Sequence, residues 1–84
     1  MERIPLAHKI VSIERAMPRV QTRGQHPKCG DCTEPAELTL GTMDIGGNGG
    51  YLDLCSGHLE KRLDTEPGFA SRVIAGLIRD RLKE

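Results

Sequence analysis

Three cysteines and one histidine are spaced as two pairs of potential metal ligands. Cys29 and Cys32 form a C-x-x-C pair, and Cys55 and His58 form a C-x-x-H pair further along the chain. Two ligands separated by two residues can bind one ion from a single turn, and zinc prefers four thiolate and imidazole ligands in a tetrahedron. Taken together, the two pairs predict one zinc ion (Zn2+) in a closed, structural site.

Other chemistry is open to the same residues. Cys29 and Cys32 alone could be a redox pair, although no thioredoxin-like βαβ pattern surrounds them. An iron–sulfur cluster usually takes four thiolates, and three metal-free core cysteines are a further alternative. His26 is a competing fourth ligand, but Pro27 follows it in a polar connector. We expect His8 to be solvated or to face a partner.

Composition also favours a metal. The chain has 84 residues with 2% aromatic content, and so small a domain usually needs disulfides, a metal or oligomerisation. Three cysteines cannot form a closed disulfide framework. Residues 1–8 lack the apolar segment of a secretory signal, and no apolar run approaches the roughly 18 residues that span a bilayer. We therefore expect a cytoplasmic protein without a membrane partner. Disulfides rarely persist in the cytoplasm.

A β-hairpin between the two ligand pairs would bring them together. Residues 36–40 alternate between apolar and polar side chains, which is typical of a half-buried strand. Residues 46–50 are Gly-Gly-Asn-Gly-Gly, which predicts a hairpin tip. Residues 50–54 would form the returning strand, paired with 36–43.

A helix is expected directly after this hairpin, from Ser56 to about Leu63. Cys55 would then end the strand and His58 would lie on the first helical turn. The electropositive helix N-terminus would favour the Cys55 thiolate.

The flanking segments are predicted less uniquely. Leu6, Ile10, Ile13 and Met17 share one helical face, which favours a helix over 6–17. A strand over 9–14 is the alternative, since β-branched residues occur there. A last helix is expected over 69–82, with an apolar stripe of Phe69, Val73, Ile74, Leu77, Ile78 and Leu82.

The order of ligands and elements resembles the treble-clef zinc fingers: a Cys-x-x-Cys knuckle, a β-hairpin, and a helix that supplies the second ligand pair. The resemblance covers about residues 27–64, and the run from Tyr51 to Leu59 also looks like small zinc proteins of actinobacteria and their phages. It implies a small α+β, zinc-bound fold. An N-terminal arm (1–26) and a C-terminal helix (67–83) would flank the zinc module in a single domain.

Catalysis is not expected. Four protein ligands leave no coordination position for water, and the His-x-Glu motif of the zinc deaminases is absent. Residues 33–54 contain no histidine to act as the general base of a treble-clef nuclease. The glycine cluster lacks the Lys-Ser/Thr of a phosphate-binding loop.

Two binding functions remain. The apolar stripe of residues 69–82 predicts a protein-interaction adaptor or regulator, with a protein partner or a homodimer. The alternative is nucleic-acid binding, since residues 1–30 carry six Lys/Arg against two Asp/Glu. A net charge of zero and few aromatic residues argue against that alternative. Its candidate contacts are Arg15, Arg19, Arg23, Lys28, Lys61 and Arg62.

Overall fold

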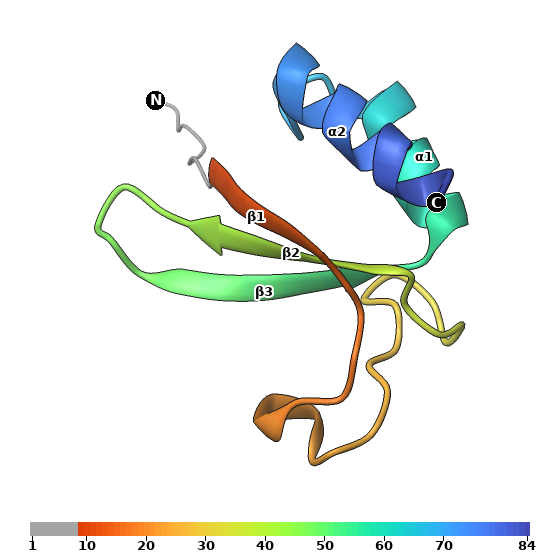
Figure 1. Ribbon diagram of the computed structural model, residues 1–84. Helices are drawn as coiled ribbons and strands as arrows, with labels where there is room; N and C mark the ends of the chain where they lie inside the picture. The colour runs from red at the N-terminus through yellow and green to blue at the C-terminus, as the bar shows by residue number, and fades with distance from the viewer. Residues whose placement is uncertain (1–8) are drawn as a thin grey trace.

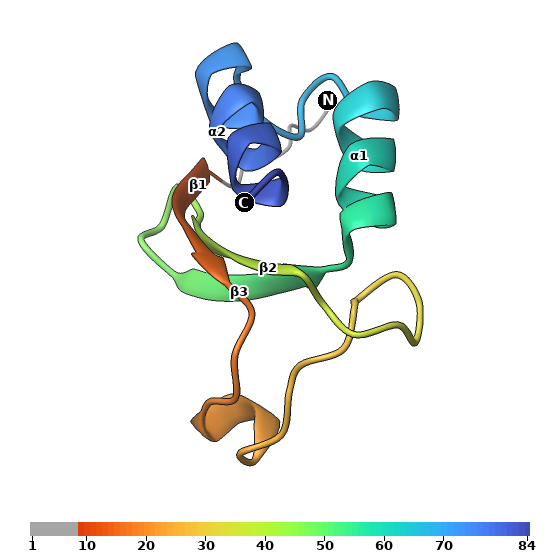
Figure 2. The same cartoon turned by 45° about the vertical axis from the view of Figure 1, so that its right-hand side comes forward.

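The computed structural model describes residues 9–84 as a three-stranded antiparallel sheet with two helices (Figure 1). The strands are β1 (Lys9–Arg15), β2 (Leu38–Met43) and β3 (Gly49–Leu54), in the order β1-β2-β3; the helices are α1 (Ser56–Thr65) and α2 (Arg72–Leu82), and a short 3₁₀ turn, η1, spans Val20–Thr22. Both helices lie on one side of the sheet, and the long β1–β2 connection extends away from them (Figure 2). The small α+β fold class is confirmed.

The core lies between the sheet and the helices. Leu38 and Leu40 alternate along β2 and face the same side as Leu54 of β3, because successive strand residues point to opposite faces. They meet Leu59 of α1 and Ile78 of α2, and all five side chains are 0% exposed. The predicted hairpin is confirmed, with β2 paired to β3 along the whole strand.

The segment at the start of the described chain is a strand, so the helix favoured over 6–17 is wrong for residues 9–15; residues 6–8 lie outside the described part. The pairing of β1 with β2 shifts between Ile10 and Ser12. Val11 is therefore an extra residue, as in a β-bulge. The bulge puts both Ile10 and Ile13 on the core face, three residues apart, and this spacing imitates a helical repeat.

The two helices follow their predictions with different boundaries. Helix α1 starts at Ser56 as expected and continues to Thr65. Helix α2 starts at Arg72, three residues later than expected, because the Ser71 hydroxyl accepts a hydrogen bond from the Ile74 amide and caps the helix there. Among residues 9–84, neither helix has the length and apolar character needed to cross a membrane.

Candidate metal centre

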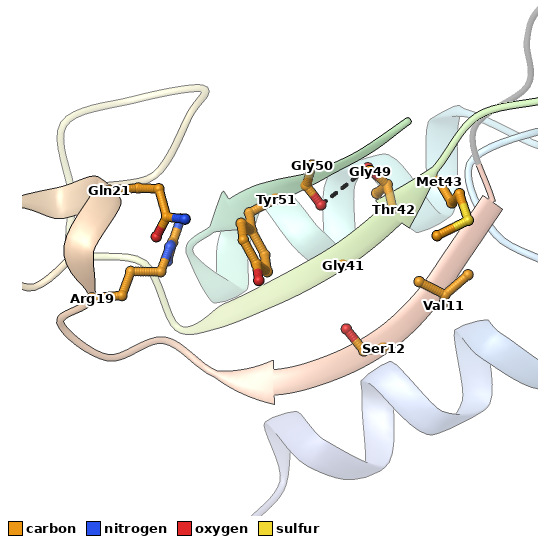
Figure 3. Close-up of a pocket in the computed structure, with 10 residues that line it drawn as sticks. All are labelled: Val11, Ser12, Arg19, Gln21, Gly41, Thr42, Met43, Gly49, Gly50 and Tyr51. Carbon is orange, nitrogen blue, oxygen red and sulfur yellow. Dashed lines mark hydrogen bonds between the residues drawn. The ribbon is translucent and has the colours of Figure 1, made fainter. Parts of the chain in front are cut away.

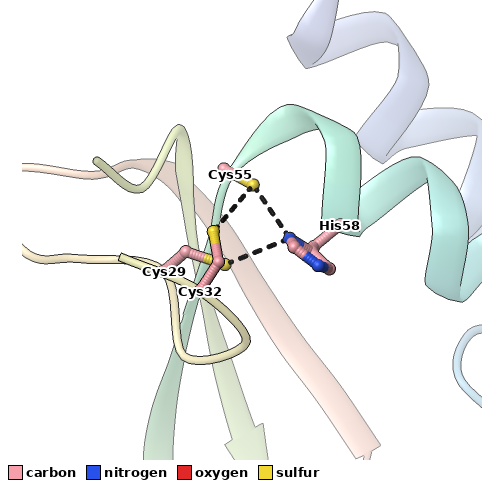
Figure 4. Close-up of side chains that lie close together, drawn as sticks. All are labelled: Cys29, Cys32, Cys55 and His58. Atoms are coloured by element: carbon pink, nitrogen blue, oxygen red, sulfur yellow. Dashed lines mark hydrogen bonds between the residues drawn. The ribbon is translucent and has the colours of Figure 1, made fainter. Parts of the chain in front are cut away.

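The four predicted ligands come together where the β1–β2 connection meets the end of β3 (Figure 4). Cys29 and Cys32 lie in a turn before β2. Cys55 is the N-cap residue of α1, and His58 lies on its first turn. One ligand atom from each residue lies within 4.8 Å of all the others. The site therefore joins two separate segments of the chain, the β1–β2 connection and the junction of β3 with α1.

The distances between ligand atoms fit one tetrahedral ion. Zn–S bonds of about 2.3 Å and Zn–N bonds of about 2.0–2.1 Å place two sulfurs about 3.8 Å apart and a sulfur about 3.6 Å from a nitrogen. The Cys32 and Cys55 Sγ atoms are 3.8 Å apart. His58 Nδ1 lies 3.2 Å from Cys55 Sγ and 3.7 Å from Cys29 Sγ. This donor set can bind one metal ion, and three sulfurs with one imidazole nitrogen favour zinc.

Backbone amides support the thiolates of the first pair. The Asp31 amide donates to Cys29 Sγ at 3.3 Å, and the Glu34 amide donates to Cys32 Sγ at 3.4 Å. Each amide lies two residues after its cysteine, so the turn itself supplies both donors. Hydrogen bonds of this kind favour the charged form of the acceptor.

Electrostatics act in opposite directions on the two thiols of the first pair. Burial raises the pKa of Cys29, but hydrogen bonds from the backbone of Cys55 and Asp31 and from the neighbouring thiols together outweigh this effect, and the pKa is lowered overall. The Glu34 amide lowers the pKa of Cys32, yet burial and the two neighbouring thiols raise it to about 11. A cation bound between the sulfurs removes this conflict, because it compensates the charge of several thiolates at once.

An ion pair fastens the Cys29–Cys32 turn to α1. Arg62 donates two hydrogen bonds to the Asp31 carboxylate, from Nε at 2.9 Å and from Nη2 at 2.8 Å. The same guanidinium lies 5.7 Å from the ring centroid of Phe69. Its hydrogen bonds hold the pKa of Asp31 below the ordinary value despite the opposing effect of burial. Arg62 is one of the candidate nucleic-acid contacts, and the sequence contains no signal for this partner, which is 31 residues away.

The competing histidine lies outside the cluster. His26 Nε2 is 2.9 Å from the Ala36 carbonyl oxygen. Since a carbonyl oxygen only accepts, Nε2 donates this hydrogen bond. The His26 ring therefore links two points of the β1–β2 connection. His8 lies outside the described residues.

The six candidate nucleic-acid contacts divide into two groups. Arg15 pairs with Glu37, Arg19 pairs with Asp53, and Arg62 is held as described above. In the described part of the chain, the other three have no ion-pair partner within 4.0 Å, and all are exposed: Arg23, Lys28 and Lys61.

Arg19 has a structural setting that the sequence did not indicate. Its two Nη atoms donate to both carboxylate oxygens of Asp53 at 3.0 and 2.8 Å, and Thr39 donates to the same carboxylate. The guanidinium also lies 4.7 Å from the ring centroid of Tyr51. These contacts attach the segment after β1 to the outer face of the sheet.

An open groove of about 660 Å³ lies beside this ion pair, on the face of the sheet opposite the helices (Figure 3). Val11, Met43 and Tyr51 provide its apolar lining, and Arg19 is its one charged lining residue. Because Asp53 neutralises Arg19, the groove has no group that would select a charged ligand.

Comparison of the chain with protein-family models, with curated proteins and with solved structures found no match.

Proposed function

We propose that this chain is a treble-clef-like module in which one zinc ion has a structural role and the protein surface binds a partner protein. The number of donor atoms around the candidate centre supports the structural role of the zinc ion. Cys29, Cys32, Cys55 and His58 lie close enough to bind one ion together, and four protein ligands would leave no position for the water that a catalytic zinc needs. The function then belongs to the surface and not to the metal.

The exposed side of α2 supports the choice of a protein partner. Val73 and Leu77 lie one turn apart on this helix and are 72% and 48% exposed. Clustered apolar side chains on a surface are typical of protein-interaction sites. In contrast, half of the candidate nucleic-acid contacts are held by carboxylates of the same chain, which lowers the positive charge available to a phosphate backbone.

The two binding functions respond differently to salt. The zinc-loaded chain is titrated with random-sequence duplex DNA at about 50 mM and 200 mM salt, a range over which phosphate contacts lose orders of magnitude in affinity. We expect no binding at either concentration. Salt-sensitive binding at 50 mM would instead favour the nucleic-acid alternative.

The partner is sought by capture from the source cell with three baits: wild type, Leu77→Lys and Ile45→Lys. Ile45 is a matched control because it is 86% exposed but lies in the hairpin loop, away from α2. A partner that binds wild type and Ile45→Lys, and is lost with Leu77→Lys, would support a protein-binding role for α2. Equal capture by all three baits would contradict it.

A further inference from the structure

The outward face of α2 contains a glycine that the described chain does not explain. Ile74 and Ile78 turn toward the core, whereas Val73 and Leu77 face outward with Gly76 between them. No neighbouring heavy atom lies within 4 Å of the place that a Cβ atom on Gly76 would take. A glycine in mid-helix is less stable than alanine, so its presence on an open face is consistent with close approach of another backbone.

Two charges on the same helix are placed against its dipole, although Arg79 and Arg81 in its last turn are placed favourably. Arg72 is the first residue of α2, and Asp80 lies two residues before its end. Cations are unfavourable near a helix N-terminus and anions near a C-terminus. Within residues 9–84, neither side chain has an ion-pair partner within 4.0 Å. Both charges would be compensated by a second helix that runs in the opposite direction.

We propose that this face of α2 binds the same face of a second copy of the chain, antiparallel and with the two-fold axis at Gly76. The inference rests on the proposed function and names its partner. At about 1.5 Å per residue, Arg72 and Asp80 lie about 6 Å from Gly76 on opposite sides. The axis therefore brings Arg72 of one copy level with Asp80 of the other.

The apolar side chains fit the same axis. Val73 lies about 4.5 Å from Gly76 along the helix, and Leu77 lies about 1.5 Å on the other side. In the pair, the order along one side of the contact is valine, leucine, leucine, valine, with successive side chains coming from alternate copies. Gly76 allows the two backbones to approach closely at the centre.

The contact area sets the range of protein concentration in which the dimer should form. One pair of 11-residue helices buries less than the roughly 1,600 Å² of a standard stable interface. We therefore expect a weak dimer, with a dissociation constant on the order of 10–100 μM. Such a dimer forms only at high local concentration.

Sedimentation equilibrium of the zinc-loaded full chain, from about 1 μM to 1 mM, tests this proposal. Wild type and Ile45→Lys should shift from monomer to dimer across the series, and Leu77→Lys should stay monomeric. A wild type that is monomeric throughout would overturn the dimer. The proposed function would survive that result if capture returned a different protein that depends on Leu77.

Charge reversal tests the antiparallel arrangement. Arg72→Asp and Asp80→Arg each improve the match to the dipole of their own helix, so each single variant should melt at a higher temperature as a dilute monomer. In the dimer each creates two like-charge pairs, and its dissociation constant should rise about tenfold. The double variant should return to within about threefold of wild type. Single variants that dimerise as well as wild type would refute this register.

Discussion

Removing the metal should unfold the whole domain, and the size of the core shows why. The described chain has five fully buried large side chains: Leu38, Leu40, Leu54, Leu59 and Ile78. Burial of one such side chain contributes about 1.5–3 kcal/mol, so together they contribute about 8–15 kcal/mol. A structural zinc ion in a small finger contributes about 10–16 kcal/mol, which is comparable to the contribution of all five side chains. Net stabilities of domains are only about 5–15 kcal/mol, so the fold should not survive loss of the ion.

The assay combines far-ultraviolet circular dichroism with elemental analysis. A strong chelator is added to the zinc-loaded chain until the protein fraction contains no metal. Helix and strand signals should be lost together, because the four ligands join the β1–β2 connection, β3 and α1. Restoring one equivalent of zinc should restore the spectrum.

Substitution of one ligand should have the same effect without a chelator. Cys55→Ser removes a thiolate from the junction of β3 and α1 and should prevent folding in zinc. Ser56→Ala is the matched control, since Ser56 is the exposed neighbouring residue and its loss should change stability by less than about 0.5 kcal/mol. An unchanged spectrum of demonstrably metal-free protein would refute the reasoning, because the apolar core would then suffice.

Three further substitutions test how the elements are held. A Cβ atom on Gly41 would overlap the Ser12 hydroxyl of β1, so Gly41→Ala should reduce the free energy of unfolding by about 1–3 kcal/mol in urea titration, and Ser12→Ala should recover part of this loss. Arg62→Gln should reduce stability by about 1 kcal/mol and release zinc at lower chelator concentration, whereas Lys61→Gln should change neither. Leu59→Ala leaves a cavity beneath the metal centre and should lower the free energy of unfolding by about 2–5 kcal/mol.

The ligands and the hairpin were predictable because their signals are local. Two residues separate the members of each ligand pair, and the alternation along β2 is visible in the sequence itself. The position of His58 followed from the strand that ends just before Cys55. These features require no knowledge of distant contacts.

The structure of residues 9–15 was not predictable in the same way. Ile10 and Ile13 have helical spacing, and only the pairing with β2 reveals that Val11 is an extra residue in a bulge. Likewise, Ser71 competes with Phe69 as the start of α2, and the hydrogen bond to the Ile74 amide decides between them. Both features depend on contacts that periodicity does not encode.

The ion-pair partners of the basic residues were also not predictable from the sequence, and this affects how binding experiments should be interpreted. Arg19 and Arg62 each donate hydrogen bonds to a carboxylate more than thirty positions away. Arg19 thereby attaches the segment after β1 to the sheet, and Arg62 attaches the Cys29–Cys32 turn to α1. Their substitution would disturb the fold around the metal centre. Lost DNA binding in such variants would therefore not identify a phosphate contact. Substitution of Arg23, Lys28 or Lys61 tests the nucleic-acid alternative cleanly, because in the described chain these exposed side chains form no ion pair within 4.0 Å.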